Sequence, residues 1–284
     1  MMSTKTPKTT YLHDYTPPAY RIPRIDLHLD LGDAHTTVQS RLHIVRAETT
    51  PAGTPLILDG QHLELLALAL DGKPLSDAHY RIDADHLTLL DPPASFELAV
   101  TTRIHPQDNT ALEGLYQSSG NFCTQCEAEG FRRITYFLDR PDVMAVFTTT
   151  LLAEQARYPV LLSNGNPVAS GTLDDGRHWA TWHDPFPKPC YLFALVAGHL
   201  NYIEDSFTTQ SGRLVTLRIY VEPHNIDQCA HAMYALKQAM AWDEQRFGLE
   251  YDLDLYMIVA VGDFNMGAME NKGLNVFNTK YVLA

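Results

Sequence analysis

The segment Met266 to Asn271, which reads MGAMEN, combines a carboxylate, an amide and two small residues on one short stretch. Gly267 and Ala268 would let another backbone come close, as when an extended peptide joins a strand edge through main-chain hydrogen bonds. Glu270 could then face the end of that peptide. The alternative is a glycine-bounded turn that carries a solvated Glu, and local physics alone favours that turn.

A second segment, Gln125 to Pro141 (QCEAEGFRRITYFLDRP), carries a high density of charge. Such density usually belongs to a solvated or ion-paired surface. If Glu127 instead enters a cleft beside Glu270, two carboxylates could enclose one ammonium group. Each charge-assisted hydrogen bond would then contribute on the order of 1.5 to 3 kcal/mol and would select an amino end over an internal amide. The spacing cannot establish this pairing, because more than a hundred residues separate the two segments.

Neither the histidines nor the cysteines form a metal-binding pattern. None of the 13 histidines belongs to an H-E-x-x-H motif, which binds zinc from one helix face and supplies a general base. Cys123 and Cys126 form a C-x-x-C that could be half of a zinc knuckle, but no second pair completes four ligands. We therefore expect no metal on this chain. Four scattered cysteines also favour structural thiols and a reducing, cytoplasmic compartment.

The composition indicates a globular protein and excludes two function classes. A chain of 284 residues with 45% apolar content can supply a substantial core. The formal net charge of -13, without any basic run, argues against nucleic acid as a partner. The polar start and the lack of a long apolar run predict neither a secretory signal nor a membrane segment.

Short runs of alternating apolar residues predict strands through roughly the first 200 residues. A period of two begins at Ile25, and Asp71 with Gly72 predicts a hairpin turn. No convincing long helix occurs there, so the pattern favours an antiparallel β-sandwich. We expect Trp179 and Trp182 to fill a core rather than to form a binding platform.

The pattern changes after Pro223, where Asn225 and Gln228 resemble a helix N-cap with its N3 partner. Gly248 is expected to end the helix, and residues 253–261 read as an interior strand that leads into MGAMEN. The order of strand, helix and strand predicts a second domain that opens near residue 200 and is unfinished at the last residue. The helix should bury an apolar stripe made of Cys229, Met233, Leu236 and Met240.

Several blocks of the chain resemble the zinc aminopeptidases related to aminopeptidase N, and their bacterial branch in particular. GAMEN at Gly267 to Asn271 is similar to the exopeptidase motif of that family. By this similarity the family covers the whole chain, with the specific blocks after residue 110. These blocks are QCEAEGFRRITYFLDRPDVMAVF at 125–147, KPCYLFALVAG at 188–198 and MGAMENKGLNVFNTKYVLA at 266–284.

The resemblance implies a mainly β fold in two parts. Residues 1–199 would form an antiparallel, saddle-like, all-β domain. Residues 200–284 would form the incomplete, β-rich start of a thermolysin-like α/β catalytic domain that carries GAMEN. The partners of the chain would then be peptides with a free N-terminus, together with the remainder of the catalytic domain and the C-terminal domains.

The resemblance also implies a substrate site. Glu127 and Glu270 would hold the free α-amino group of a peptide, and Gln125 and Met266 would line the pocket for its first side chain. A methionine suits a permissive pocket, because its unbranched thioether repacks easily. The other members of the substrate-binding set, which contact the peptide backbone or position the motif strand, would be Gly267, Ala268, Met269 and Asn271.

The family's chemistry requires zinc held by H-E-x-x-H and a further Glu, with a later Tyr that stabilises the tetrahedral intermediate. These 284 residues contain no H-E-x-x-H. The full-length zinc enzyme would remove single amino acids from peptide N-termini, whereas this chain alone is expected to be inactive. Two alternatives stay open, namely a noncatalytic truncated homologue that binds peptides or a partner, and a structural β-sandwich adaptor.

Overall fold

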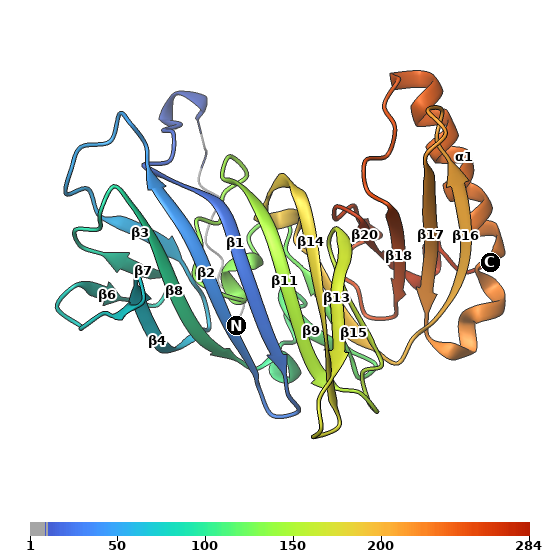
Figure 1. Cartoon of the computed structure of the whole chain (residues 1–284), viewed down its shortest axis with the longest axis horizontal. Coiled ribbons are helices and arrows are strands. Elements are labelled where there is room, and N and C mark those ends of the chain that lie inside the picture. The colour runs from blue at the N-terminus through green and yellow to red at the C-terminus, as the bar shows by residue number, and fades with distance from the viewer. Residues whose placement is uncertain (1–8, 10) are drawn as a thin grey trace.

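Four β-sheets and a single α-helix build the fold in the computed structural model, which describes residue 9 and residues 11–284. A broad sheet of eight strands packs with two smaller sheets of four and three strands around one core. A five-stranded sheet follows along the chain, and helix α1 (Ala230–Phe247) covers its far face (Figure 1). We call β1–β15 the N-terminal unit and β16–β20 with α1 the C-terminal unit.

The eight-stranded sheet has the order β13-β14-β11-β1-β2-β8-β4-β5, and only β1 and β11 pair in parallel. The alternation predicted from Ile25 is confirmed, because Ile25, Leu27, Leu29 and Leu31 are buried on one face of β1. The strands are β1 (Tyr20–Leu31), β2 (Thr36–Arg46), β4 (Glu64–Leu70), β5 (Lys73–Pro74), β8 (Ser95–Ile104), β11 (Met144–Glu154), β13 (Asn166–Thr172) and β14 (Arg177–Pro189).

The connections in the N-terminal unit agree with the local signals. Asp71 and Gly72 join β4 to β5 with φ angles of 49° and 76°, the positive values that a two-residue type I′ hairpin needs. Before residue 199 the described helical segments are single 3-10 turns, which confirms the prediction that this part has no long helix. These turns are η1 (Leu12–Asp14), η2 (Pro106–Asp108), η3 (Phe131–Arg133) and η4 (Cys190–Leu192).

The two smaller sheets close the core of the N-terminal unit. A cluster of phenylalanine rings, 5.1 to 6.4 Å apart between centroids, fills the space between the sheets. The cluster comprises Phe131, Phe137, Phe147 and Phe193. The four-stranded sheet contains β12 (Val160–Ser163), β15 (Leu195–Gly198), β10 (Asn121–Gln125) and β9 (Gly114–Ser118) in that order, and the three-stranded sheet contains β3 (Leu56–Asp59), β7 (His86–Leu89) and β6 (Tyr80–Ile82).

The C-terminal unit is a mixed sheet with one helical crossover. Strands β17, β18 and β20 are parallel neighbours, and α1 connects β17 to β18. Its strands in sheet order are β16 (Asn201–Thr208), β17 (Leu214–Val221), β18 (Leu255–Val261), β20 (Leu274–Asn278) and β19 (Ala268–Met269). The sheets change between Gly198 and Asn201. The division into domains 1–199 and 200–284 is consistent with this change and stays a prediction.

Helix α1 buries the predicted stripe and ends as predicted at Gly248, whose φ is 66°. The expected N-cap at Asn225 is wrong. Asn225 lies inside the 3-10 helix η5 (Pro223–Gln228), where its own N–H bonds the carbonyl of Glu222, and the α-helix begins only at Ala230. Pro223 fixes a helical φ at the first position and starts this tighter turn earlier than the capping pattern indicates.

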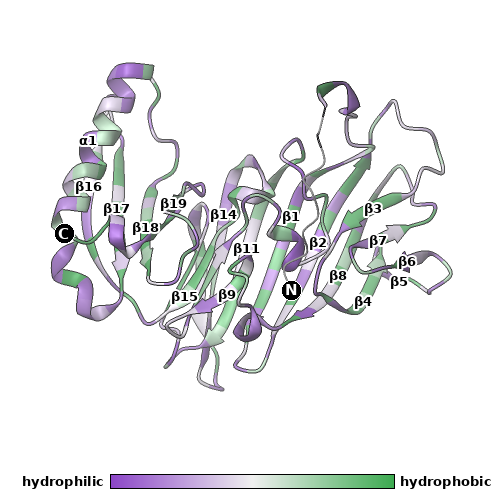
Figure 2. Ribbon diagram, turned by 180° about the vertical axis from the view of Figure 1, so that it is seen from behind, coloured by the Kyte–Doolittle hydropathy of each residue, from purple (hydrophilic) through white to green (hydrophobic). Residues whose placement is uncertain are grey.

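Strand β18 is buried on both faces, which explains its nearly continuous apolar sequence. Ile258 and Ala260 face α1, whereas Met257 and Val259 pack against the N-terminal unit. Figure 2 shows hydrophobic green along most of β18 and a mixture of purple, white and green residues along α1. No helix among the described residues is both long and apolar enough to cross a membrane. The last 3-10 turn is η6 (Thr279–Tyr281).

A second core joins the two units. Trp182, which is 5% exposed, belongs to it and donates from Nε1 to the carbonyl of Leu161 at 3.0 Å. Its expected place in a core is therefore confirmed. The same expectation is wrong for Trp179, which is half-buried and packs in neither of these two cores. Apolar side chains of β9, β10 and β15 meet those of β18, β19 and β20 in this core. The junction between the units is thus a packed interface rather than a hinge lined by water.

Candidate functional site

The segment that joins β18 to β20, residues 262–273, contains the MGAMEN motif and is called the amino-end loop. Inside it, β19 pairs antiparallel with β20 through Ala268 opposite Phe277 and Met269 opposite Val276. β19 is the last strand of its sheet, so one side of it has no partner strand among the described residues. The motif therefore lies on an open sheet edge, which is where an added peptide strand could bind.

The backbone of Ala268 faces this open side. The carbonyl of Gly267 accepts a hydrogen bond from the N–H of Asn278 at 2.9 Å, which turns the polar groups of Gly267 toward β20. Along a strand these groups alternate, so the N–H and C=O of Ala268 point away from the sheet. Ala268 is exposed, and its small side chain leaves the approach to those groups open.

Gln125 brings the two predicted segments together. It is the last residue of β10, is 0% exposed, and donates from Nε2 to Sδ of Met266 at 2.9 Å. Its Oε1 accepts from the backbone N–H of Glu127 at 3.3 Å. One buried amide thus contacts both the amino-end loop and the start of the charged segment, across 141 positions of sequence.

Glu127 and Glu270 differ from the carboxylates around them. Most of the charged segment is ion-paired, as the structural interpretation predicts: Glu129 pairs with Arg132 at 3.3 Å, and Arg132 also contacts Asp139 at 2.9 Å. Among residues 9 and 11–284, by contrast, the carboxylate of neither Glu127 nor Glu270 makes an ion pair or a hydrogen bond. Glu127 is half-buried and Glu270 is exposed. Both carboxylates are therefore available to a cation.

The remaining motif residues lie beneath the edge. Met269 is 0% exposed and packs in the core between the two units. Asn271 is 1% exposed, its Nδ2 donates to the carbonyl of Met269 at 3.4 Å, and its Oδ1 has no partner in the described part of the chain. Met266, at 38% exposure, and Gly267 are reachable from the surface. Met266 and Gly267 can therefore contact a ligand, whereas Met269 and Asn271 support the sheet edge from its buried side.

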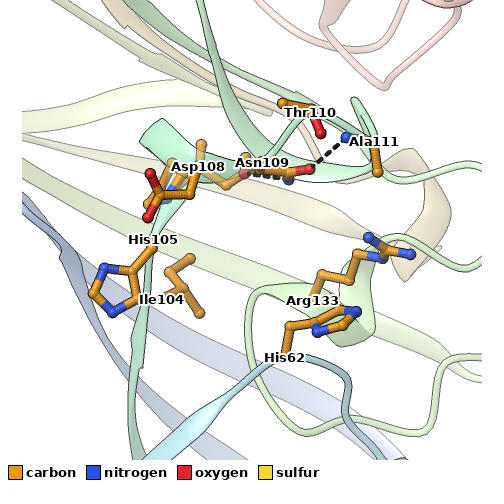
Figure 3. A pocket seen from close by; sticks show the side chains of 10 residues that line it. His62, Ile104, His105, Asp108, Asn109, Thr110, Ala111 and Arg133 are labelled. Carbon is orange, nitrogen blue, oxygen red and sulfur yellow. Dashed lines mark hydrogen bonds between the residues drawn. The ribbon is translucent and has the colours of Figure 1, made fainter.

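Two cavities lie near the charged segment, but only one includes a predicted site residue. A cavity of about 240 Å³ borders Glu127 and is lined by Gln61, Glu113, Glu127, Ala128, Glu129 and Gly130. A cavity of about 330 Å³ near η2 contains His62, His105 and Arg133 (Figure 3). Arg133 is already paired with Glu113 at 2.8 Å, and none of the predicted site residues lines this second cavity.

The cysteines do not form a metal centre. All four are free and buried, which confirms their interpretation as structural thiols. Cys123 packs in the core between the units and Cys126 in the core of the N-terminal unit. Burial raises the pKa of Cys123 to about 12, which disfavours the thiolate that zinc requires. No group of three or more His, Cys, Asp or Glu in the described part of the chain could hold a metal ion.

Comparison with known protein families decides which family the chain belongs to. Residues 17–192 match the Peptidase M1 N-terminal domain, and residues 231–284 match the Peptidase family M1 domain. The chain belongs to the M1 peptidase family. This confirms the resemblance drawn from GAMEN and the longer blocks. The gap between the two M1 matches contains the change of sheet between Gly198 and Asn201.

Individual M1 relatives resemble the whole chain. Aminopeptidase N of Escherichia coli is 54% identical over 281 residues, which cover 99% of this chain and 32% of the relative. The structure of Legionella pneumophila aminopeptidase A in complex with aspartic acid is 38% identical and superposes on 97% of this chain and 32% of its own, with a TM-score of 0.92. The mainly β fold class is thereby confirmed.

A more distant M1 structure shares the fold. It is a mutant M1 zinc metallopeptidase from Deinococcus radiodurans bound to a Tyr-Ser-Ala substrate, with 17% identity and a TM-score of 0.77. It covers 93% of this chain, which in turn corresponds to 61% of that protein. The chain spans about a third of the length of the curated M1 relatives that match it.

Proposed function

We propose that this chain is the N-terminal part of an aminopeptidase that removes single amino acids from peptide N-termini, and that it holds the substrate's amino end. The contact between Gln125 and Met266 carries the proposal, because it joins the two segments whose carboxylates, Glu127 and Glu270, have no cationic partner among the described residues. The α-ammonium group of a peptide would supply that positive charge. The names of the M1 relatives support the same reaction class.

The open edge of β19 supplies the second half of the proposed site. The N–H and C=O of Ala268 would pair with the backbone of the peptide, while Gln125 and Met266 would border its first side chain. Gly267 leaves room for that approach. Met269 and Asn271 would support the edge from the buried side, consistent with their exposures of 0% and 1%.

Zinc belongs to the proposed full-length enzyme rather than to these residues. The relative from Deinococcus is a zinc metallopeptidase by name, but the described residues of this chain offer no ligand set that fits the ion. We therefore assign no step of hydrolysis to this chain and propose that other parts of the catalytic domain hold the metal. The remainder of the catalytic and C-terminal domains would be its partners, and the four free thiols support a cytoplasmic location.

Titration calorimetry with a tripeptide, in free and N-acetylated forms, tests the proposed amino-end site. Glu127→Gln and Glu270→Gln each remove one charge-assisted hydrogen bond to the ammonium. We expect affinity for the free peptide to fall on the order of tenfold to a hundredfold, and the acetylated peptide to bind weakly throughout. The chain supplied with zinc should release no amino acid.

Glu129→Gln is the matched control, because Glu129 lies two positions from Glu127 and is paired with Arg132. It should leave peptide affinity unchanged. A structural β-sandwich adaptor predicts no effect of any of the three substitutions, so that result would reject the amino-end site. Peptide binding by the chain without activity in the longer protein would instead favour the noncatalytic homologue.

A further inference from the structure

The amino-end loop is fastened at both ends by side chains of the N-terminal unit. At its start, Oγ of Ser118 donates to Oδ2 of Asp263 and accepts from the N–H of Asp263, both at 3.0 Å. The hydroxyl of Tyr116 donates to the carbonyl of Asp263 at 2.9 Å. Ser118 and Tyr116 are buried in β9, at 2% and 0% exposure. The N–H, the carbonyl and the carboxylate of one loop residue are thus all bound by one strand of the other unit.

At the end of the loop, Asn164 performs the corresponding role. Its Nδ2 donates to the carbonyl of Lys272 at 2.8 Å and to that of Leu192 at 3.0 Å, and its Oδ1 accepts from the N–H of Ala194 at 2.7 Å. Asn164 is 3% exposed. Its amide therefore ties the residue after the motif to the backbone around η4 and β15.

Backbone packing confirms that this end of the loop is held closely. A Cβ built on Gly273 would lie 3.3 Å from the backbone nitrogen of Gly165. The Asn164–Gly165 turn therefore rests directly on the end of the amino-end loop. Between the two fastened ends, β19 contributes only two paired positions to its sheet.

The two carboxylates of the proposed site come from opposite sides of these contacts. Glu127 belongs to the N-terminal unit and Glu270 to the amino-end loop, so their separation is set across the junction. Charge-assisted hydrogen bonds to one ammonium require both oxygens within about 3 Å of it, and small displacements weaken them steeply. We propose that Ser118 and Asn164 are positioning residues for the amino-end site, which they hold in register without contacting the peptide. This inference rests on the proposed function.

Hydrogen exchange of the amino-end loop tests the positioning directly. Asn164→Ala removes all three bonds of the side chain, whereas Asn164→Asp keeps the acceptor for Ala194 and loses the donors to Lys272 and Leu192. Both variants, and Ser118→Ala, should accelerate exchange in peptides covering 263–273 on the order of tenfold. Asn164→Asp and Ser118→Ala keep the test valid if Asn164→Ala fails to fold.

Asn166→Ala is the matched control for this experiment. Asn166 exchanges two hydrogen bonds with Asp254, at 3.0 Å each, and so also connects the two units, but neither bond involves a residue of the amino-end loop. It should leave exchange at 263–273 unchanged. Unaltered loop exchange in folded Asn164→Asp and Ser118→Ala proteins, or equal acceleration in Asn166→Ala, would overturn the positioning role.

Peptide binding separates this inference from the proposed function. Asn164→Asp and Ser118→Ala should lower the ratio of affinities for the free and the N-acetylated tripeptide on the order of tenfold, while Asn166→Ala keeps it. An unchanged ratio would overturn the proposal. If the unmodified chain binds no peptide, the proposed function fails, and the exchange experiment still decides whether Ser118 and Asn164 fix the loop.

Discussion

Charged residues at the junction fall into two kinds, which differ in how they are compensated. Glu127 and Glu270 are accessible and have no charged partner in the part of the chain that the structure describes, so leaving them unpaired costs little in the free protein. Lys188 and Asp184 are the opposite case: their side chains are 4% and 0% exposed and lie 3.1 Å apart. The ammonium of Lys188 also lies 3.9 Å from the centroid of the Phe147 ring. We interpret the first pair as available to a ligand and the second as structural.

The buried pair predicts a characteristic dependence of stability on pH. Burial lowers the pKa of Lys188 to about 8, while the nearby Asp184 carboxylate acts in the opposite direction. Between that value and the unfolded value near 10.4, the unfolded chain holds more protons than the folded chain. The contribution of Lys188 to the free energy of unfolding therefore rises with pH across this window, by at most about 3 kcal/mol, and is constant below it.

Urea denaturation at pH 7.5 to 10.5 measures this contribution. The reference is the double variant Asp184→Asn with Lys188→Met, which has no ionisable group at the pair. The difference in unfolding free energy between the wild type and this variant should shift in favour of the wild type as pH rises. A difference that stays constant, or that shifts the other way, would show that burial does not lower the pKa of Lys188 in the folded protein.

At the scale of elements, residue patterns in short segments predicted the strands and the helix whose formation depends on those same segments. The period of two at Ile25 predicted β1, and the stripe with Gly248 predicted the body and end of α1. The helix start was missed, because Asn225 matches a capping pattern while Pro223 begins a 3-10 turn. Nothing local showed that β19 is an edge strand, since that depends on its pairing with β20.

Gly248 allows one such local inference to be tested. It ends α1 in a left-handed conformation, with φ 66° and ψ 24°, and a Cβ at this position would meet nothing within 4 Å. Gly248→Ala should therefore destabilise the chain by about 1 kcal/mol through backbone strain alone. Gly262→Ala is the control, because its Cβ would lie 3.9 Å from Oγ of Ser118 and its φ is not positive. Equal stability of the two variants in urea would contradict the strain argument.

For the molecule as a whole, the candidate site depends on the junction between the units. From the sequence, family resemblance predicted the residues of the site, but their meeting could not be derived, because Gln125 and Met266 are 141 positions apart. The supporting residues Ser118 and Asn164 carried no signal at all, since a single Ser or Asn in a β-rich segment matches no motif. Only the packing of β9, β10 and β15 against the C-terminal sheet makes their contacts evident.

A shared core predicts that the two units unfold together. Met269 is 0% exposed inside that core, so Met269→Ala should lower the free energy of unfolding by about 2 to 5 kcal/mol through lost contacts and a cavity. Tryptophan fluorescence in a Trp242→Phe background reports on β14, and circular dichroism at about 222 nm follows α1, where backbone amides of a helix absorb.

Both signals should keep a common midpoint in urea, before and after the Met269 change, because the core couples β14 to the sheet that carries α1. Met144→Ala serves as the control: this methionine is 48% exposed, and its loss should change stability by less than about 0.5 kcal/mol. Midpoints that separate, or a loss confined to the helical signal, would mean that the units fold independently. The junction could then not hold Glu127 and Glu270 at a fixed separation.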